Sequence, residues 1–180
     1  MRRATAHVAL LRGINLGKRR LPMKDLAAML EEAGCTDVWT YIQSGNVVYR
    51  AAPALARRVP GVLEEEIAER YGFECPVVTR TRAEIDEIVV GNPFPEAAAE
   101  PKTLHVGFLR DRPGKAQVAA LDPDRSPPDA FVVKGREIYV HYPKGSARSK
   151  LTPQYFDPRL ETTSTFRNWR TLLTLQEMMR

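Results

Sequence analysis

The sequence contains few cysteines and histidines, and the rarity of these two residue types restricts its chemistry. Cys35 and Cys75 are 40 positions apart, and neither belongs to a Cys-x-x-Cys or Cys-His pattern. This usage is typical of a reducing compartment and argues against a structural zinc site. The three histidines, His7, His105 and His141, all fall within predicted strands, and no carboxylate-His-Ser order accompanies them. We therefore expect no metal and no cofactor, and the sequence leaves open whether the protein is an enzyme.

Long apolar runs are also absent. No window approaches the roughly 18 apolar residues of a membrane span. The run HVALL near the N-terminus is too short for a signal peptide and leads directly into charged residues. We therefore expect a soluble, cytoplasmic protein with no membrane partner. The hydrophobic fraction of 43% indicates a packed core, and the formal net charge of +5 favours acidic partners without requiring one.

The residues that are present form two copies of one pattern. In the first half, a strand at 7–11 precedes a helix between Pro22 and Gly34, a hairpin around 44–46, a helix at 59–71 and a strand at 75–80. A capping box at Thr81 and Glu84 predicts one more short helix. The second half repeats this order. It is predicted to contain a strand at 104–110, a helix at 115–121, a hairpin at 130–142, a helix at 150–156, a strand at 161–166 and a helix from Asn168. HVALLR at 7–12 and HVGFLR at 105–110 share four of six residues.

This duplication predicts an α+β fold with two ferredoxin-like βαββαβ halves and an extra C-terminal helix, in one compact unit. We expect residues 1–90 to form the first half plus a helix, 91–103 a linker rich in proline, alanine and glutamate, and 104–180 the second half with the terminal helix. One continuous sheet with accidental similarity is the alternative. HVALL and HVGFL carry apolar residues on both of their faces, so both faces of each sheet should be covered. Helices would cover one face, and the other half or the terminal helix would cover the second.

The end of the first strand is one candidate ligand site. A helical crossover makes the second strand parallel to the first, so the hairpin should turn where the first strand ends. Residues 12–15 and 44–46 should therefore meet, near the N–H groups that open the first helix. We call this region the N-terminal rim, and its candidate ligand-binding residues are Arg12, Asn15, Lys18, Ser44 and Asn46. Tight turns also need glycine and asparagine, so a structural role for both asparagines is an equal alternative.

A second candidate site combines the segments KGSARSKLT at 144–152 and FRNWR at 166–170. Both follow strands that should end at one common end of the second sheet. Their hydroxyl and cationic side chains could bind an anion, although the spacing of a P-loop is absent. The candidate residues are Arg148, Ser149, Lys150, Arg167 and Asn168. The alternative is a capped helix start with Trp169 as a core residue.

Nucleic acid is a weaker expectation than a small anion. The βαββαβ order also builds the RNA-recognition motif, but that module needs aromatic side chains on its central strands. HVALL has none, and NVVYR offers only Tyr49. We therefore expect nucleic-acid binding only as a weak, non-specific phosphate contact. The sequence favours an anionic, phosphate-bearing ligand at the basic loops; the alternatives are a transferase or hydrolase acting on a nucleotide or phosphorylated metabolite, and a protein-interaction module. It does not indicate the oligomeric state.

The chain contains, in this order, the motifs ALLRGIN, LPM, TYIQSGNVVY, NPF, RSKLT and RNWRT. With these motifs it resembles, over nearly its whole length, the bacterial family catalogued as domain of unknown function 1697. The resemblance implies a two-part α+β fold with ferredoxin-like halves, and it implies no activity. The positions that fall on the family's motifs are Arg12, Gly13, Asn15, Ser44, Gly45, Asn46, Arg148, Ser149, Lys150, Arg167, Asn168 and Trp169. One departure is Lys18, where members commonly carry a second glycine after Gly17. If the loop cradles an anion by its backbone alone, Lys18 would alter its shape.

Overall fold

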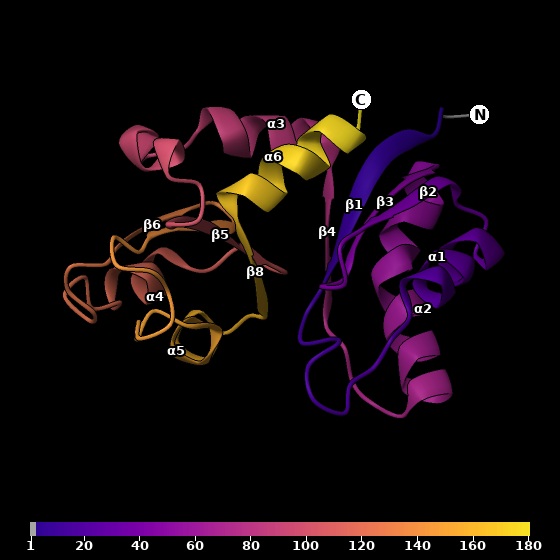
Figure 1. Cartoon of the computed structure of the whole chain (residues 1–180), viewed down its shortest axis with the longest axis horizontal. Helices are drawn as coiled ribbons and strands as arrows, with labels where there is room; N and C mark the ends of the chain where they lie inside the picture. Colours follow the sequence, from indigo (N-terminus) through magenta and orange to yellow (C-terminus); the bar gives the residue numbers. More distant parts are fainter. Residues whose placement is uncertain (1–2) are drawn as a thin grey trace. The chain divides into compact units, whose positions relative to one another are not determined.

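The structure is a computed structural model that describes residues 3–180, and it contains two packing units (Figure 1). Unit 1 comprises the described residues up to Asp86 together with Thr174–Arg180, and unit 2 comprises Glu87–Leu173. Each unit contains one four-stranded sheet with flanking helices. The two sheets are separate, so the alternative of one continuous sheet is wrong.

Unit 1 has the ferredoxin-like order that the sequence predicts. Its elements are β1 (Thr5–Leu11), α1 (Met23–Glu32), β2 (Thr36–Tyr41), β3 (Asn46–Ala51), α2 (Pro53–Tyr71) and β4 (Val77–Thr81). The strands lie in the order β2-β3-β1-β4, and all neighbours are antiparallel. In the centre, His7 of β1 lies opposite Tyr49 of β3 and opposite Thr81 of β4. The helix α3 (Arg82–Val90) begins in unit 1 and ends in unit 2.

Unit 2 repeats this arrangement. It contains a short 3-10 helix (Pro95–Ala99), β5 (Leu104–Leu109), α4 (Lys115–Ala119), β6 (Ala130–Lys134), β7 (Glu137–His141), α5 (Pro153–Leu160) and β8 (Ser164–Asn168). The order β6-β7-β5-β8 matches that of unit 1, and β5 pairs His105 with Asn168 as β1 pairs His7 with Thr81. The last helix, α6 (Trp169–Met178), begins in unit 2 and ends in unit 1. The prediction of two ferredoxin-like halves with an extra C-terminal helix is confirmed.

The ends of the helices follow from local sequence. Pro22 precedes α1 in an extended conformation, and Gly34 beyond its C-terminus has a φ of 99°. Gly72 ends α2 with a φ of 73°, as the sequence indicates. The helix α5 starts at Pro153 rather than near 150, because proline fits the first turn of a helix, where its missing N–H is not needed.

One face of each sheet forms a core with the helices. In unit 1, α1 and α2 lie on the same face of the sheet (Figure 1), and buried side chains at helical spacing pack there. Leu26 and Leu63 are completely buried against Ala9 and Val47 of the sheet. In unit 2, α5 contributes Phe156, which stacks on Phe166 of β8. These clusters hold the strands whose ends carry the candidate sites.

The opposite face of each sheet is also buried, as the apolar strands predict. Val8 and Val106 occupy equivalent central positions on these faces, and both are completely buried. In unit 1, Met179 beyond α6 lies beside Val48 of β3. In unit 2, the Tyr139 hydroxyl of β7 donates a 2.8 Å hydrogen bond to the carbonyl of Ile88 in α3. The helix that follows each half therefore contributes its final turns to the other unit.

The two connecting helices start in the same way. The Thr81 hydroxyl accepts a hydrogen bond from the Glu84 N–H, and the Glu84 carboxylate accepts one from the Thr81 N–H at 2.7 Å, which confirms the capping box. At the equivalent position in the second half, the Asn168 side chain accepts a 2.8 Å hydrogen bond from the Thr171 N–H. The last residue of each final strand thus caps the helix that follows.

Candidate functional site

The two loops of the N-terminal rim meet, as the topology predicts. The Leu11 N–H donates a 2.8 Å hydrogen bond to the Gly45 carbonyl, and the Asn15 amide donates one of 2.6 Å to the Gln43 carbonyl. Gly45 has a φ of 80°, and a Cβ atom at this position would lie 2.7 Å from the Leu11 Cβ. The two loops therefore approach so closely that only glycine fits at their contact.

The two asparagines of the rim are engaged by the protein itself. The Asn15 side chain also donates to the Leu21 carbonyl at 3.1 Å and accepts from the Leu21 N–H at 2.9 Å. Asn46 is completely buried, and its amide donates to the Tyr41 carbonyl at 3.1 Å and to the Ser44 hydroxyl at 3.0 Å. These bonds favour the structural alternative for both residues, because their amides hold the two loops in place.

The cations of the rim lie on the exposed part of the loop between β1 and α1. Lys18, Arg19 and Arg20 are exposed, while Arg12 is half-buried and its N–H donates to the Pro76 carbonyl. The Arg19 guanidinium lies 5.9 Å from the centre of the Phe73 ring. The rim therefore combines exposed cations with two asparagines whose side chains are hydrogen-bonded within the protein.

The second candidate site occupies a common end of the sheet in unit 2. His141 at the end of β7 and Asn168 at the end of β8 lie opposite the first residues of β5, as predicted. Here Arg148 and Ser149 line a surface hollow of about 370 Å³. The residues lining the rest of this hollow are Ser126, Pro127, Pro128, Asp129, Lys144, Gly145 and Ala147. We call it the unit 2 hollow.

The other predicted residues of this site have positions outside the lining of the unit 2 hollow. Arg167 is only 9% exposed on β8, where its guanidinium donates to the Thr165 hydroxyl and to the Phe166 carbonyl, both at 2.8 Å. Asn168 caps α6, and Trp169 is 3% exposed, so the core position expected for it is confirmed. The segment 166–170 thus builds the end of β8 and the start of α6.

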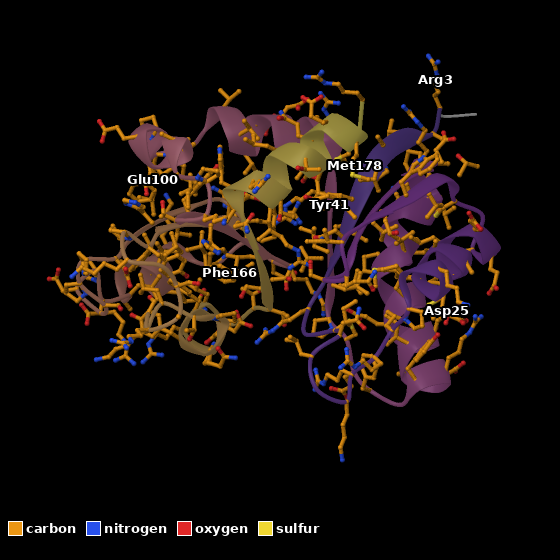
Figure 2. All side chains as sticks on the ribbon, viewed as in Figure 1. Arg3, Asp25, Tyr41, Glu100, Phe166 and Met178 are labelled. Atoms are coloured by element: carbon orange, nitrogen blue, oxygen red, sulfur yellow. The ribbon has the colours of Figure 1, made fainter. Side chains whose placement is uncertain are left out.

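Ser126 fixes the two walls of the unit 2 hollow to each other. Its hydroxyl donates to the Asp129 carboxylate at 3.0 Å and accepts a hydrogen bond from the Lys150 N–H at 3.0 Å. The Ser149 hydroxyl lies 3.5 Å from that of Ser126 and accepts from the Leu151 N–H at 3.0 Å. The loops 126–129 and 144–151 are therefore joined through serine hydroxyls. Figure 2 shows nitrogen-tipped side chains gathered along the lower left edge of this unit.

Sequence reasoning missed one wall of this hollow. The segment Ser-Pro-Pro-Asp at 126–129 is a turn signal, but nothing in its spacing indicates that it faces residues 144–149. It also missed a hollow of about 240 Å³ in unit 1, where Trp39 is 66% exposed beside Arg50. The Arg50 guanidinium there lies 3.4 Å from the Asp37 carboxylate. Tertiary contacts between distant segments create both hollows.

Both cysteines and His7 are buried, and one ring nitrogen of His105 is buried as well. Cys35 and Cys75 are buried free thiols, and burial raises the pKa of Cys35 to about 11, so its unreactive thiol form persists at neutral pH. Burial lowers the pKa of His105 to about 4. Within residues 3–180, no three His, Cys, Asp or Glu side chains gather as a metal site would require. None of the helices described is both long and apolar enough to cross a bilayer.

Comparison with known proteins supports the fold and identifies the family. A solved structure of a conserved bacterial protein from Streptococcus pneumoniae matches 98% of this chain and 99% of its own, with a TM-score of 0.69 and 21% sequence identity. No curated protein sequence gives a significant match. The family described as "Protein of unknown function (DUF1697)" matches residues 4–139. The chain therefore belongs to this family, as the resemblance of its motifs had indicated.

Proposed function

We propose that the protein binds a phosphate-bearing small molecule in the unit 2 hollow. The observation that carries this proposal is that Lys144 and Arg148 line the same hollow as the Ser149 hydroxyl. Ammonium, guanidinium and hydroxyl donors are the groups that bind phosphate oxygens in proteins. The volume of about 370 Å³ lies within the range of small-molecule sites.

Asp129 narrows the class of ligand. Asp129 is among the residues that line the hollow, and its negative charge would repel a bare phosphate ion. A phosphate ester with a hydroxyl or amine group would place its phosphate near Lys144 and Arg148 and donate a hydrogen bond to Asp129. This combination favours a sugar phosphate or a nucleotide over an inorganic anion.

The architecture of the walls also supports binding. The Ser126 hydroxyl and the Lys150 N–H join loops 126–129 and 144–151 before any ligand arrives. A hollow whose walls are already joined loses little conformational freedom when a ligand enters. The N-terminal rim is less suited to a small molecule, because the amides of Asn15 and Asn46 already donate hydrogen bonds to backbone carbonyls and to Ser44.

The test is calorimetric titration of the full chain with ribose 5-phosphate, with AMP and with ribose, which lacks phosphate. We expect binding of one or both phosphate esters and none of ribose. Arg148→Ala or Lys144→Ala should weaken binding about tenfold to a hundredfold, because a charge-assisted hydrogen bond contributes roughly 1.5–3 kcal/mol. Both side chains are exposed, so the free energy of unfolding should change by less than about 0.5 kcal/mol.

The matched control is Arg112→Ala, which removes an exposed cation of unit 2 that does not line the hollow. It should bind the esters as the natural protein does. Asp129→Asn should bind inorganic phosphate more tightly than the natural protein, because a repulsive charge is removed. Equal binding by the Arg148→Ala and Arg112→Ala variants would reject the proposal. Chemical conversion of a bound ester would favour the transferase or hydrolase alternative.

A further inference from the structure

The loop between β1 and α1 carries exposed apolar surface that takes no part in the proposed phosphate site. We call Leu16 on this loop and Ile42 on the neighbouring loop the apolar tip. Leu16 is 69% exposed, and Ile42 on the neighbouring loop is 50% exposed. The 2.6 Å hydrogen bond from the Asn15 amide to the Gln43 carbonyl joins these two loops. Two aliphatic side chains of unit 1 therefore remain in solvent on connected loops, although residues of their type are usually buried.

The shape of this tip is fixed. The Asn15 N–H donates to the Arg19 carbonyl, and the Arg19 N–H donates to the Leu16 carbonyl at 3.1 Å. Gly17 has a φ of 57°, and Ile42 has a φ of 49°, a conformation that is rare for a β-branched residue. A rigid tip loses little conformational entropy when a partner binds. The sequence therefore holds Leu16 and Ile42 exposed in one defined arrangement.

The segment that carries the apolar tip is rich in cations. The segment 12–24 contains five cations and no acidic residue, and residues 42–46 carry no charge. Three of the cations, Lys18, Arg19 and Arg20, are exposed next to Leu16 in the sequence. Glu74, beside Phe73 on the loop after α2, adds one exposed negative charge, so a positive excess remains.

An apolar centre with a cationic surround fits a protein partner better than a small ion or a nucleic acid. Protein interfaces combine apolar central residues with a polar rim, and arginine is enriched in them. A phosphate ion would leave Leu16 and Ile42 in water. A single-stranded nucleic acid would use the cations, but its bases stack on aromatic side chains, and both exposed tip residues are aliphatic.

We propose that this surface, formed by Leu16, Ile42, Lys18, Arg19 and Arg20, docks an acidic, amphipathic segment of a partner protein. Apolar side chains of the segment cover Leu16 and Ile42, and its carboxylates pair with the surrounding cations. The surface belongs to unit 1 and is independent of the phosphate ligand proposed for unit 2.

The test uses two fluorescent peptides of equal length and charge, measured by anisotropy against the full chain. One alternates leucine and glutamate, and the other has serine in place of every leucine. The leucine peptide should bind about tenfold more tightly than the serine peptide, because it covers apolar surface as well as pairing charges. Added salt should weaken both complexes. Equal affinity of the two peptides would overturn the proposal.

Leu16→Ser and Ile42→Asn should each reduce the affinity for the leucine peptide towards that for the serine peptide. The matched control is Val90→Ser, which removes an aliphatic side chain that is 88% exposed in unit 2 and should leave binding unchanged. Lys18→Gln should weaken the binding of both peptides. The proposal fails if Leu16→Ser binds as the natural protein does. It also fails if a single-stranded oligonucleotide or vesicles of phosphatidylcholine and phosphatidylserine bind more tightly than the leucine peptide.

Discussion

At the scale of single residues, burial decides the chemistry of the histidines. His105 lies on the central strand β5, where its ring meets that of Tyr142 edge to face at 5.0 Å. Its Nδ1 atom is buried and, within the described residues, accepts no hydrogen bond and donates none. Burial therefore favours the neutral ring and lowers the pKa of His105 to about 4. His105 is a structural residue that makes the stability of the protein depend on pH.

We predict that the free energy of unfolding falls as the pH drops from 6.5 towards 4. In this window the unfolded chain binds a proton at His105, whose ordinary pKa is 6.5, and the folded protein does not. The loss should be on the order of 2–3 kcal/mol. Urea unfolding at several pH values would measure it. His105→Gln should show a shallower dependence below pH 6.5 than the natural protein, and an unchanged slope would contradict this assignment.

At the scale of elements, the β1–α1 loop and the loop between β2 and β3 approach each other closely, and this contact determines the conformation of the N-terminal rim. Gly45 combines a φ of 80° with a position where a Cβ atom would lie 2.7 Å from the Leu11 Cβ and 2.9 Å from the Ile14 side chain. Gly72 at the end of α2 has a similar φ of 73°, but a Cβ atom there would have no neighbour within 4 Å. Replacing Gly72 by alanine therefore tests the energetic cost of the positive φ alone, and replacing Gly45 tests that cost together with the cost of a steric clash.

We predict that Gly45→Ala lowers the free energy of unfolding by about 2–4 kcal/mol, because conformational strain and overpacking both contribute. Gly72→Ala should cost only about 1–2 kcal/mol, from conformation alone. Chemical unfolding of both variants would measure the difference. Equal losses would show that the contact between the β1–α1 loop and the hairpin can relax at no cost.

The helices, the strands and their order were largely predictable from the sequence. Apolar periodicity and the glycine and proline positions located the elements of both halves, and the topology alone predicted that residues 12–15 meet 44–46. The roles of the residues in these two loops could not be predicted from the sequence in the same way. Asn15 and Asn46 suit a ligand site and a turn equally well as residue types, and only their hydrogen bonds distinguish the two roles. The pairing of 126–129 with 144–149 depends on tertiary folding, so no local pattern could predict it.

At the scale of the whole molecule, the two helices α3 and α6 each contribute to a unit other than the one in which they begin. The end of α6 and the residues beyond it belong to unit 1, where Leu175 and Met179 are buried. Met179 shares the lining of the unit 1 hollow with Ala6 and Val48 of the sheet. The stability of the first half should therefore depend on residues from the far end of the sequence.

We predict that Met179→Ala destabilises unit 1 by about 2–5 kcal/mol, the usual cost of truncating a buried methionine. Hydrogen exchange followed by mass spectrometry should show faster exchange in β1 and β3. Glu177→Ala, which changes an exposed side chain two residues earlier, in the last turn of α6, is the matched control and should leave exchange in these strands unchanged. Faster exchange in neither strand of the Met179→Ala variant would contradict the assignment of this segment to unit 1.

The return of the chain to unit 1 has a consequence for protein synthesis. The ribosome makes residues 174–180 after all of unit 2, so the first half emerges before the segment that completes it. Until then, nascent residues 3–86 lack part of the cover that keeps their apolar strands from water. Exposed apolar surface of this kind promotes aggregation and chaperone binding. The nascent first half should therefore bind chaperones until residues 174–180 have left the ribosome and can pack on it.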